Sequence, residues 1–240
     1  MKTNIKLTIV YDNKSMQKNL QTDWGFSCLV EFDKTKLLFD TGDNGSILLS
    51  NMNKLDIEPK NINTVFLSHF HHDHIGGLQE FLKKNSKVKI FYPQSFPLEI
   101  IDMIKNSGAM PVPVSDFVEI FQEVFSLGEI DGKIPEQSLA LHSSKGIVVI
   151  TGCAHPGIIK ILEKAKNKFP NELIYLALGG FHLHRLNEDE INDIIQKIFD
   201  MGILTIAPAH CSGDIARKMF KEVFDKNYIE IGAGKIITID

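Results

Sequence analysis

The stretch that decides the fold runs from Leu67 to Leu78 and reads LSHFHHDHIGGL. It places four histidines and one aspartate within the six positions from His69 to His74, directly after an apolar, β-branched segment. Imidazole and carboxylate groups are costly to crowd together in a folded chain unless a cation binds them. We therefore interpret the stretch as a metal-binding loop that follows a buried strand.

The spacing within this loop suggests which side chains act together. Residues at i and i+2 of an extended chain project in the same direction, so we expect His69 and His71 to reach one ion. Asp73 and His74 follow on the turn and are expected to point to a second position nearby. His72 points away from His71 in an extended chain, so we leave it out of the ligands. A metal site needs three or four ligands, and the remaining ones must come from elsewhere.

Three later histidines each come just after a predicted apolar strand. His155 follows GIVVITG, His182 follows LIYLALGG and His210 follows LTIAPA. Functional residues of open α/β sheets gather where the strands end, so these three histidines are further candidates for the site. Cys153 and Cys211 stand beside them, and we interpret both as buried thiols rather than ligands.

The composition excludes several classes of protein. The net charge is -4, and only two arginines occur among the 26 basic residues, so the chain lacks the basic stripe of a nucleic-acid binder. No window approaches the roughly 18 uninterrupted apolar residues of a membrane helix, and MKTNIKLTIV lacks the apolar core of a signal peptide. The three cysteines show no CxxC spacing. We predict a reduced, soluble, cytoplasmic protein, and the sequence carries no signal of its oligomeric state.

Strand-like and helix-like segments alternate along the chain, which indicates an α/β fold. No low-complexity linker divides the 240 residues, so we expect one domain over residues 1–240. The predicted strands are 4–13, 26–32 and 36–42 as a hairpin, 64–69, 88–92, 146–152, 173–180, 204–210 and two short ones within 228–239. The predicted helices are 45–55, 75–85, 97–108, 156–168, 187–202 and 215–225, and residues 111–145 contain several short strand candidates.

Short motifs extend this pattern over nearly the whole chain. In order, they read FDTG (39–42), SHFHHDHIGG, TGCAHPG and APAHCSG. With these motifs the chain resembles the metallo-β-lactamase superfamily, whose hallmark is HxHxDH followed by two further histidines after later strands. WGFS, EQSL (Glu136–Leu139), TGCAHPGI, GGFHL and APAHCSG make it most similar to the group named after dihydropterin ribofuranosylaminobenzene phosphate synthase. The resemblance implies a four-layer αββα sandwich with the metal ions at one edge.

The resemblance also implies a ligand set for two divalent metal ions. The histidine and carboxylate ligands suit zinc, although manganese and iron accept them too. One ion is expected between His69, His71 and His155, and the other between Asp73, His74 and His210.

The segment LALGGFHLHR departs from the commoner pattern of the superfamily. Typical members place here an aspartate that bridges both metal ions, whereas this chain supplies His182. A neutral imidazole cannot bridge two cations as a carboxylate does, so we predict that His182 either binds one ion alone or contacts the substrate.

Three more residues are candidates for substrate binding. Gly180 permits close approach of a backbone. Ser212 stands where a helix begins after His210, and it either binds a phosphate group of the substrate or caps that helix. Trp24 precedes a strand on an early loop and is expected to form a wall of the pocket.

The leading hypothesis for function is a metal-dependent hydrolase or transferase that acts on a small, phosphorylated or pterin-like substrate. Metal-activated water is the expected nucleophile, with Asp73 and His182 as the catalytic side chains. The alternative is a non-catalytic or redox metal-binding sensor on the same scaffold. The redox relatives carry a glutamate where His71 stands and add a flavin domain that 240 residues cannot contain.

Overall fold

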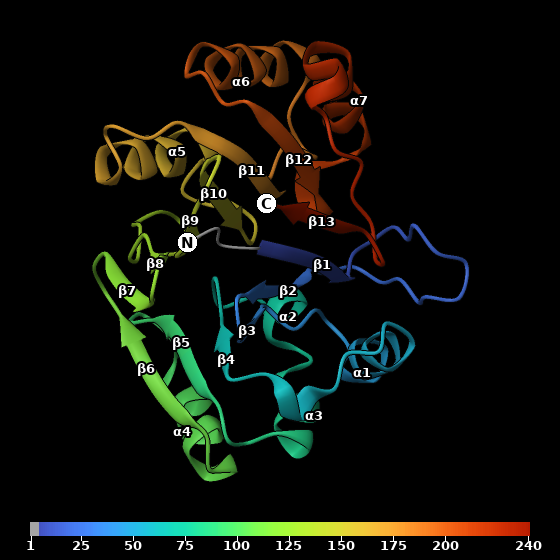
Figure 1. Ribbon diagram of the computed structural model, residues 1–240, viewed down its shortest axis with the longest axis vertical. Coiled ribbons are helices and arrows are strands. Elements are labelled where there is room, and N and C mark those ends of the chain that lie inside the picture. Colours follow the sequence, from blue (N-terminus) through green and yellow to red (C-terminus); the bar gives the residue numbers. More distant parts are fainter. Residues whose placement is uncertain (1–4) are drawn as a thin grey trace. The chain divides into compact units, whose positions relative to one another are not determined.

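The computed structural model describes residues 5–240, so Asn4, at the start of the first predicted strand, lies outside them. The chain divides into two compact units. Unit 1 comprises the chain up to Ser115 together with Ile231–Asp240, and unit 2 comprises Asp116–Glu230. Within the described residues, each unit contains one β-sheet built from its own strands, together with helices (Figure 1). A single domain over residues 1–240 stays a prediction.

The sheet of unit 1 has seven strands among the described residues, in the order β13-β1-β2-β3-β4-β5-β6. The pairs from β13 to β3 are antiparallel and those from β3 to β6 are parallel. The C-terminal strand thus pairs with the N-terminal one (Figure 1). The strands are β1 Ile5–Tyr11, β2 Ser27–Phe32, β3 Thr35–Phe39, β4 Thr64–Phe66, β5 Lys89–Pro93, β6 Met110–Val114 and β13 Ile236–Ile239.

The neighbours β3 and β4 bring two distant parts of the chain to the same edge of the sheet. They are parallel, and Phe39 at the end of β3 pairs with Phe66 at the end of β4. Parallel strands end on the same side, so Asp40 after β3 and His69 after β4 emerge together. The predicted hairpin of β2 and β3 is confirmed, and its turn contains Asp33 with a φ of 51°.

The prediction of one helix over residues 75–85 differs from the structure, which has two helices there, His72–Ile75 and Leu78–Lys84, separated by a pair of glycines. A Cβ atom on Gly76 would lie 2.1 Å from Asp43 O, and one on Gly77 would lie 2.3 Å from Thr41 O. Only glycine lets the chain pass this close to the loop after β3. The helices of unit 1 are α1 Gly45–Lys54, the 3-10 turn η1 Pro59–Asn61, α2 His72–Ile75, α3 Leu78–Lys84 and α4 Leu98–Ser107.

The sheet of unit 2 contains six strands among the described residues, in the order β12-β11-β10-β9-β8-β7. The pairs β12–β11 and β11–β10 are parallel, so the loops that follow these three strands lie at one edge. The remaining pairs are antiparallel. The strands are β7 Val118–Phe121, β8 Val124–Ser126, β9 Leu139–Ser143, β10 Gly146–Thr151, β11 Ile174–Gly180 and β12 Thr205–Ala209.

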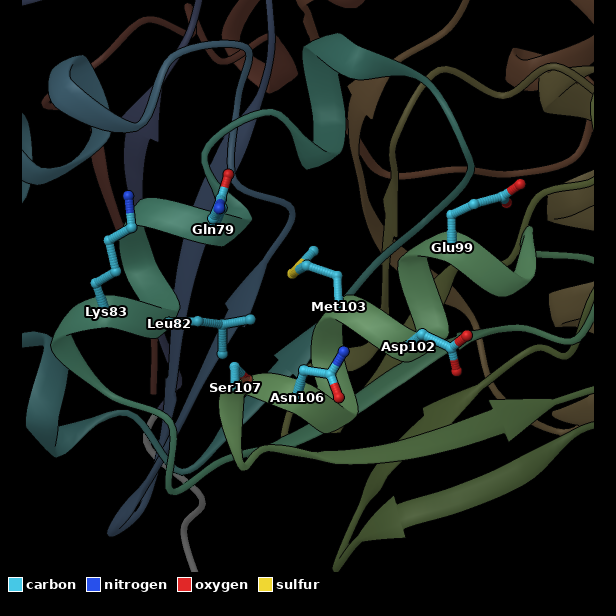
Figure 2. Close-up of a pocket in the computed structure, with 8 residues that line it drawn as sticks. All are labelled: Gln79, Leu82, Lys83, Glu99, Asp102, Met103, Asn106 and Ser107. Atoms are coloured by element: carbon cyan, nitrogen blue, oxygen red, sulfur yellow. The ribbon is translucent and has the colours of Figure 1, made fainter.

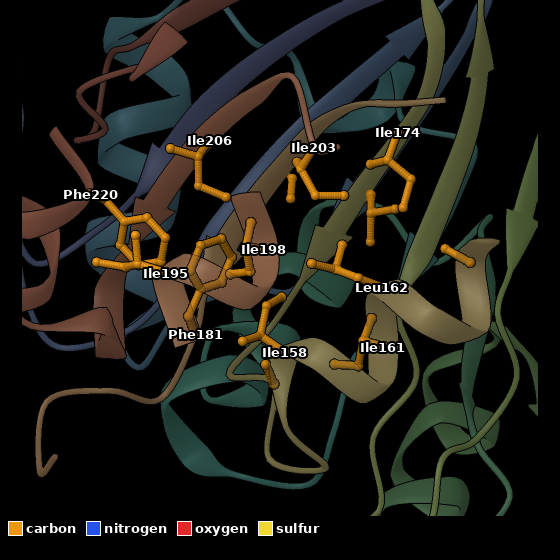
Figure 3. Close-up of a cluster of buried hydrophobic side chains, with 14 of the residues drawn as sticks. Ile158, Ile161, Leu162, Ile174, Phe181, Ile195, Ile198, Ile203, Ile206 and Phe220 are labelled. Carbon is orange, nitrogen blue, oxygen red and sulfur yellow. The ribbon is translucent and has the colours of Figure 1, made fainter. Parts of the chain in front are cut away.

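Three amphipathic helices bury their apolar faces in the core of unit 2. Isoleucines and leucines of α5 and α6 pack with Phe181 and with Phe220 of α7 (Figure 3). Asn187 and Glu190 form a reciprocal capping box at the start of α6, which satisfies two backbone N–H groups. The helices are α5 Ile158–Lys168, α6 Glu188–Asp200 and α7 Asp214–Phe224, with 3-10 turns η2 His210–Ser212 and η3 Asp225–Asn227.

The C-terminal segment differs from the prediction of two short strands within residues 228–239. Only β13 forms there, whereas Tyr228 makes an isolated bridge to Ile206 and Ile229 N–H donates to Ile206 O. The chain between them turns at Gly234, which has a φ of 89°. None of the helices in residues 5–240 is long and apolar enough to span a bilayer.

Candidate metal centre

The histidine stretch of unit 1 folds into a tight cluster of ring nitrogens. His69 Nε2 lies 3.1 Å from His71 Nδ1, and the rings of His69 and His74 are 4.2 Å apart. Asp73 adds a carboxylate whose Oδ2 lies 3.7 Å from His74 Nε2. The structure therefore brings together the four residues of this stretch that the sequence predicts as ligands.

Asp40 is hydrogen-bonded to residues of this cluster, and both Asp40 and His74 are fully buried. Its Oδ2 lies 2.6 Å from His74 Nδ1, and its Oδ1 accepts a hydrogen bond from Ser68 N–H at 2.7 Å. Ser68 Oγ donates to Asp40 Oδ2 at 2.6 Å and lies 2.9 Å from His69 Nδ1. A single carboxylate thus orients two candidate ligands, one directly and one through a serine.

These bonds determine which nitrogen of each ring carries the proton. An ionised carboxylate only accepts, so His74 Nδ1 is protonated and the Ser68 hydroxyl hydrogen points at Asp40. The Ser68 oxygen must then accept from His69 Nδ1–H. Both rings consequently present the lone pair of Nε2, which is the form that binds a metal.

Burial shapes the protonation of the cluster. It lowers the pKa of His71, and the nearby His74 adds to this effect while Asp73 opposes it. The net lowering favours the neutral imidazole that metal binding requires. Burial also raises the pKa of the Asp40 carboxyl above its usual value, and the interactions with His74 and Ser68 oppose that effect without cancelling it.

His72 lies apart from the cluster, as its position in the stretch predicts. Its side chain is 76% exposed, and its Nδ1 lies 2.7 Å from Asp43 Oδ1. His72 begins α2, so it turns away from His71, which precedes that helix in an extended conformation.

Unit 2 gathers a second set of donor groups at the ends of its parallel strands. The rings of His155 and His182 are 4.4 Å apart. Ligand atoms of Cys153, His182 and Cys211 lie within 4.8 Å of one another, and Cys211 Sγ–H donates to Cys153 O at 3.7 Å. His210 is buried in η2, immediately after β12.

Several residues that follow strands in the two units have left-handed backbone conformations that L-residues seldom adopt. The φ angles are 57° at Ala154, 55° at His182 and 44° at His210 in unit 2, and 52° at Asp40 in unit 1. Such conformations persist only where the surroundings enforce them, and they concentrate at functional sites. The tight turns after β3, β10, β11 and β12 are therefore specified by their contacts.

The three predicted substrate residues have distinct environments. A Cβ atom on Gly180 would lie 2.4 Å from Gly152 O, so this glycine is required by the packing of β11 against the loop after β10. Ser212 is buried and its Oγ accepts from Phe181 N–H, whereas α7 begins after Gly213 without a side-chain cap. Trp24 is 47% exposed on the loop between β1 and β2. Substrate binding by these residues stays a prediction.

Sequence reasoning assigned no role to two buried carboxylates, Asp40 and Glu136. Both occur in motifs, FDTG and EQSL, that carried the resemblance. The signal that could have identified them is an acidic residue within an otherwise apolar or small-residue segment. Such a segment is expected to be buried, and an acidic residue is seldom buried unless it is paired.

A separate cavity lies in unit 1 between α3 and α4 (Figure 2). Its volume is about 570 Å³, and Leu82 and Met103 supply its apolar part. It contains no histidine or cysteine and none of the predicted site residues. Its lining residues are Gln79, Leu82, Lys83, Glu99, Asp102, Met103, Asn106 and Ser107.

The donor groups of unit 1 fit a bound transition metal. Ligands about 2.0–2.1 Å from a tetrahedral zinc ion lie about 3.3 Å from one another, close to the separation between His69 Nε2 and His71 Nδ1. The hydrogen bonds from Nδ1 of His69 and His74 are the outer contacts that metal-binding histidines usually make.

The chain is similar to known proteins over nearly its whole length. The chain is 29% identical to a 7,8-dihydropterin-6-methyl-4-(beta-D-ribofuranosyl)-aminobenzene-5'-phosphate synthase of Methanocaldococcus jannaschii, over 98% of this chain and 96% of that protein. A solved metal-dependent hydrolase of the beta-lactamase superfamily is 28% identical, with a TM-score of 0.82 over 97% of this chain and 98% of that one.

A second solved structure supports the fold alone. It is the metallo-beta-lactamase fold protein YhfI from Bacillus subtilis, 16% identical with a TM-score of 0.73 over 99% of this chain and all of that one. The sequence pattern of the metallo-beta-lactamase superfamily matches residues 25–210. The predicted α/β class with the metallo-β-lactamase fold is confirmed, and the chain belongs to the metallo-β-lactamase superfamily.

Proposed function

We propose that the protein is a hydrolase or transferase that uses two divalent metal ions, zinc in the first place and manganese or iron as alternatives. The observation that carries the proposal is the cluster of His69, His71 and His74 beside Asp73, in which Asp40 and Ser68 orient the rings. A purely structural histidine cluster has no need of rings aligned through their outer nitrogens.

The ligand set follows the resemblance to the superfamily. We assign His69, His71 and His155 to one ion and Asp73, His74 and His210 to the other. His182, whose ring lies 4.4 Å from that of His155, is assigned to the substrate or to one ion.

Bound divalent cations lower the pKa of a water molecule to about 7 and polarise a carbonyl or phosphoryl oxygen. Asp73 would orient the attacking water by accepting a hydrogen bond from it and would take up its proton, which is the role that the sequence predicts for this carboxylate. His182 would either bind one ion or donate a hydrogen bond to the substrate.

The substrate class is inferred from a relative. A pterin linked to a phosphorylated ribose appears in the name of the synthase that this chain resembles over nearly its whole length. We therefore propose a small phosphorylated or pterin-like substrate, with Ser212, Gly180 and Trp24 near it.

The test is to measure metal content and turnover together. Elemental analysis of purified wild type should find about two equivalents of metal, and His71→Ala and His155→Ala should each lower that number. His72→Ala is the matched control, because it removes a histidine from the same stretch that is exposed and outside the proposed ligands.

Turnover distinguishes the enzyme from a sensor. Wild type should hydrolyse bis(4-nitrophenyl) phosphate, and a chelator should abolish this activity. Metal content unchanged in both ligand variants would refute the assignment. Metal binding without any turnover would favour the non-catalytic alternative.

A further inference from the structure

Glu136 is a fully buried carboxylate in the connection between β8 and β9. Its backbone is fixed by two hydrogen bonds with Ile130: Ile130 N–H donates to Glu136 O at 2.9 Å, and Glu136 N–H donates back at 3.3 Å. The side chain extends from this bridge toward the loop that follows β10.

The carboxylate receives the N–H groups of four consecutive residues of that loop. Oε1 accepts from Gly152 at 3.1 Å, from Cys153 at 3.0 Å and from Ala154 at 2.9 Å, and Oε2 accepts from His155 at 2.8 Å. An ionised carboxylate has about four acceptor sites and no hydrogen to donate, so it matches four convergent N–H groups better than any neutral side chain.

The loop needs such a partner because its conformation is unfavourable by itself. Ala154 has a φ of 57°, and the chain turns again at Gly157 with a φ of 100°. Four backbone N–H groups pointing the same way repel one another when no anion faces them. Glu136 supplies that anion from a segment 16 to 19 residues earlier in the chain.

We propose that Glu136 is a positioning residue that presents His155 to the metal centre by holding the loop Gly152–His155 in its strained conformation. This inference rests on the proposed function of His155 as a ligand. The bond to Oε2 is made by His155 itself, so the backbone of the ligand is attached directly to the carboxylate.

The first measurement needs no metal. Hydrogen exchange of backbone amides is followed by NMR in the metal-free 240-residue protein, for wild type and for Glu136→Gln. The glutamine amide offers one acceptor oxygen and turns its own N–H groups toward the loop, so exchange of the amides at 152–155 should rise about tenfold or more. Amides in the rest of unit 2 should change much less.

Ser126→Ala is the matched control. Ser126 is equally buried at the end of β8, where its Oγ donates to Gln137 Oε1 and accepts from Gly128 N–H, and neither bond involves residues 152–155. The Ser126→Ala substitution should lower the stability of unit 2 without a selective increase in amide exchange at residues 152–155. If Glu136→Gln does not fold, Glu136→Asp, which keeps the charge on a shorter side chain, should show the same selective increase to a smaller extent.

The second measurement is a double-mutant cycle on zinc affinity. Glu136→Gln should weaken binding about 10- to 100-fold in the wild-type background, as loss of an outer partner of a ligand does. In the His155→Ala background the same change should have less than about a twofold effect, because the residue that Glu136 positions is gone.

The outcomes separate this inference from the proposed function. Unchanged exchange at residues 152–155 overturns the role of Glu136, whatever the metal content. Faster exchange with an equal loss of zinc affinity in both backgrounds also overturns it, because the effect is then general destabilisation. If wild type binds no metal, the proposed function fails, and the positioning of a ligand by Glu136 fails with it even where exchange responds.

Discussion

At the scale of single residues, two buried carboxylates organise the candidate ligands in the same physical way. Asp40 accepts from His74 and Ser68, and Glu136 accepts from the loop that ends at His155. A buried carboxylate is stable only when hydrogen bonds replace the water it has lost. Each one therefore enforces the geometry of the groups around it.

Replacement of Asp40 tests this arrangement in unit 1. Asp40→Asn keeps the size of the side chain and tolerates the φ of 52°, yet its amide cannot accept from three donors. We expect the free energy of unfolding to fall by about 2–4 kcal/mol and zinc affinity to fall about 10- to 100-fold. Urea unfolding of the metal-free protein and zinc titration measure the two effects.

Asp56→Asn is the control for Asp40→Asn. Asp56 also has a left-handed conformation, with a φ of 55°, but its side chain is exposed at the end of α1. Asp56→Asn should leave the free energy of unfolding and the zinc affinity nearly unchanged. If Asp40→Asn loses stability but retains full zinc affinity, Asp40 supports the fold and does not orient the ligands.

At the scale of elements, three neighbouring antiparallel strands of the sheet in unit 1 carry a row of charged residues, one glutamate between two lysines. Glu31 of β2 stands opposite Lys6 of β1 and Lys36 of β3. Its carboxylate lies 2.8 Å from Lys6 Nζ and 2.9 Å from Lys36 Nζ. Partial burial raises the pKa of Glu31, but the two lysines outweigh that effect and the net pKa lies below its usual value.

This lowered pKa predicts how the contribution of Glu31 to the free energy of unfolding depends on pH. A carboxyl whose pKa is lower in the folded state stabilises the fold above its unfolded pKa, and that contribution disappears as the pH falls through the folded pKa. Glu31→Gln should therefore be less stable than wild type near pH 7 by up to about 1 kcal/mol, because the pair is partly exposed. The difference should vanish near pH 2 in urea unfolding.

The lysines provide the control for this pH dependence. In a Lys6→Gln, Lys36→Gln background, the further change Glu31→Gln should have a much smaller effect near pH 7. A difference between wild type and Glu31→Gln that stays constant down to the lowest pH would show that the charge of Glu31 is not its cause.

At the scale of the whole molecule, the proposed ions would take ligands from both units and should stabilise the folded chain. A ligand that binds only the folded state stabilises it by about 2.7 kcal/mol at one hundred times its dissociation constant. Zinc added to the metal-free protein should raise the urea midpoint in a concentration-dependent way, as followed by circular dichroism.

Variants in either unit should reduce this stabilisation. His69→Ala in unit 1 and His210→Ala in unit 2 should each diminish the shift, whereas His72→Ala should retain it. A midpoint that does not depend on zinc concentration in wild type would contradict metal binding by the folded protein.

Much of the architecture could be predicted from the sequence. The hairpin of β2 and β3, the helix α4 with its end at Gly108, and the strands β10, β11 and β12 have strong local periodicity or clear punctuation. Where local signals were weak, prediction was poorer. The split of α2 from α3 depends on close contacts of Gly76 and Gly77 with the loop after β3, and those contacts are not encoded in the helix itself.

By itself, the sequence determined that histidines would crowd at the end of a strand and that three later strands would each end near another histidine, because these patterns lie within short segments. Only the tertiary structure decided how the ligands are oriented. His74 and Asp40 are 34 residues apart, and His155 and Glu136 are 19 apart. Contacts between distant residues form only when strands pair and loops pack, and local patterns carry no record of them.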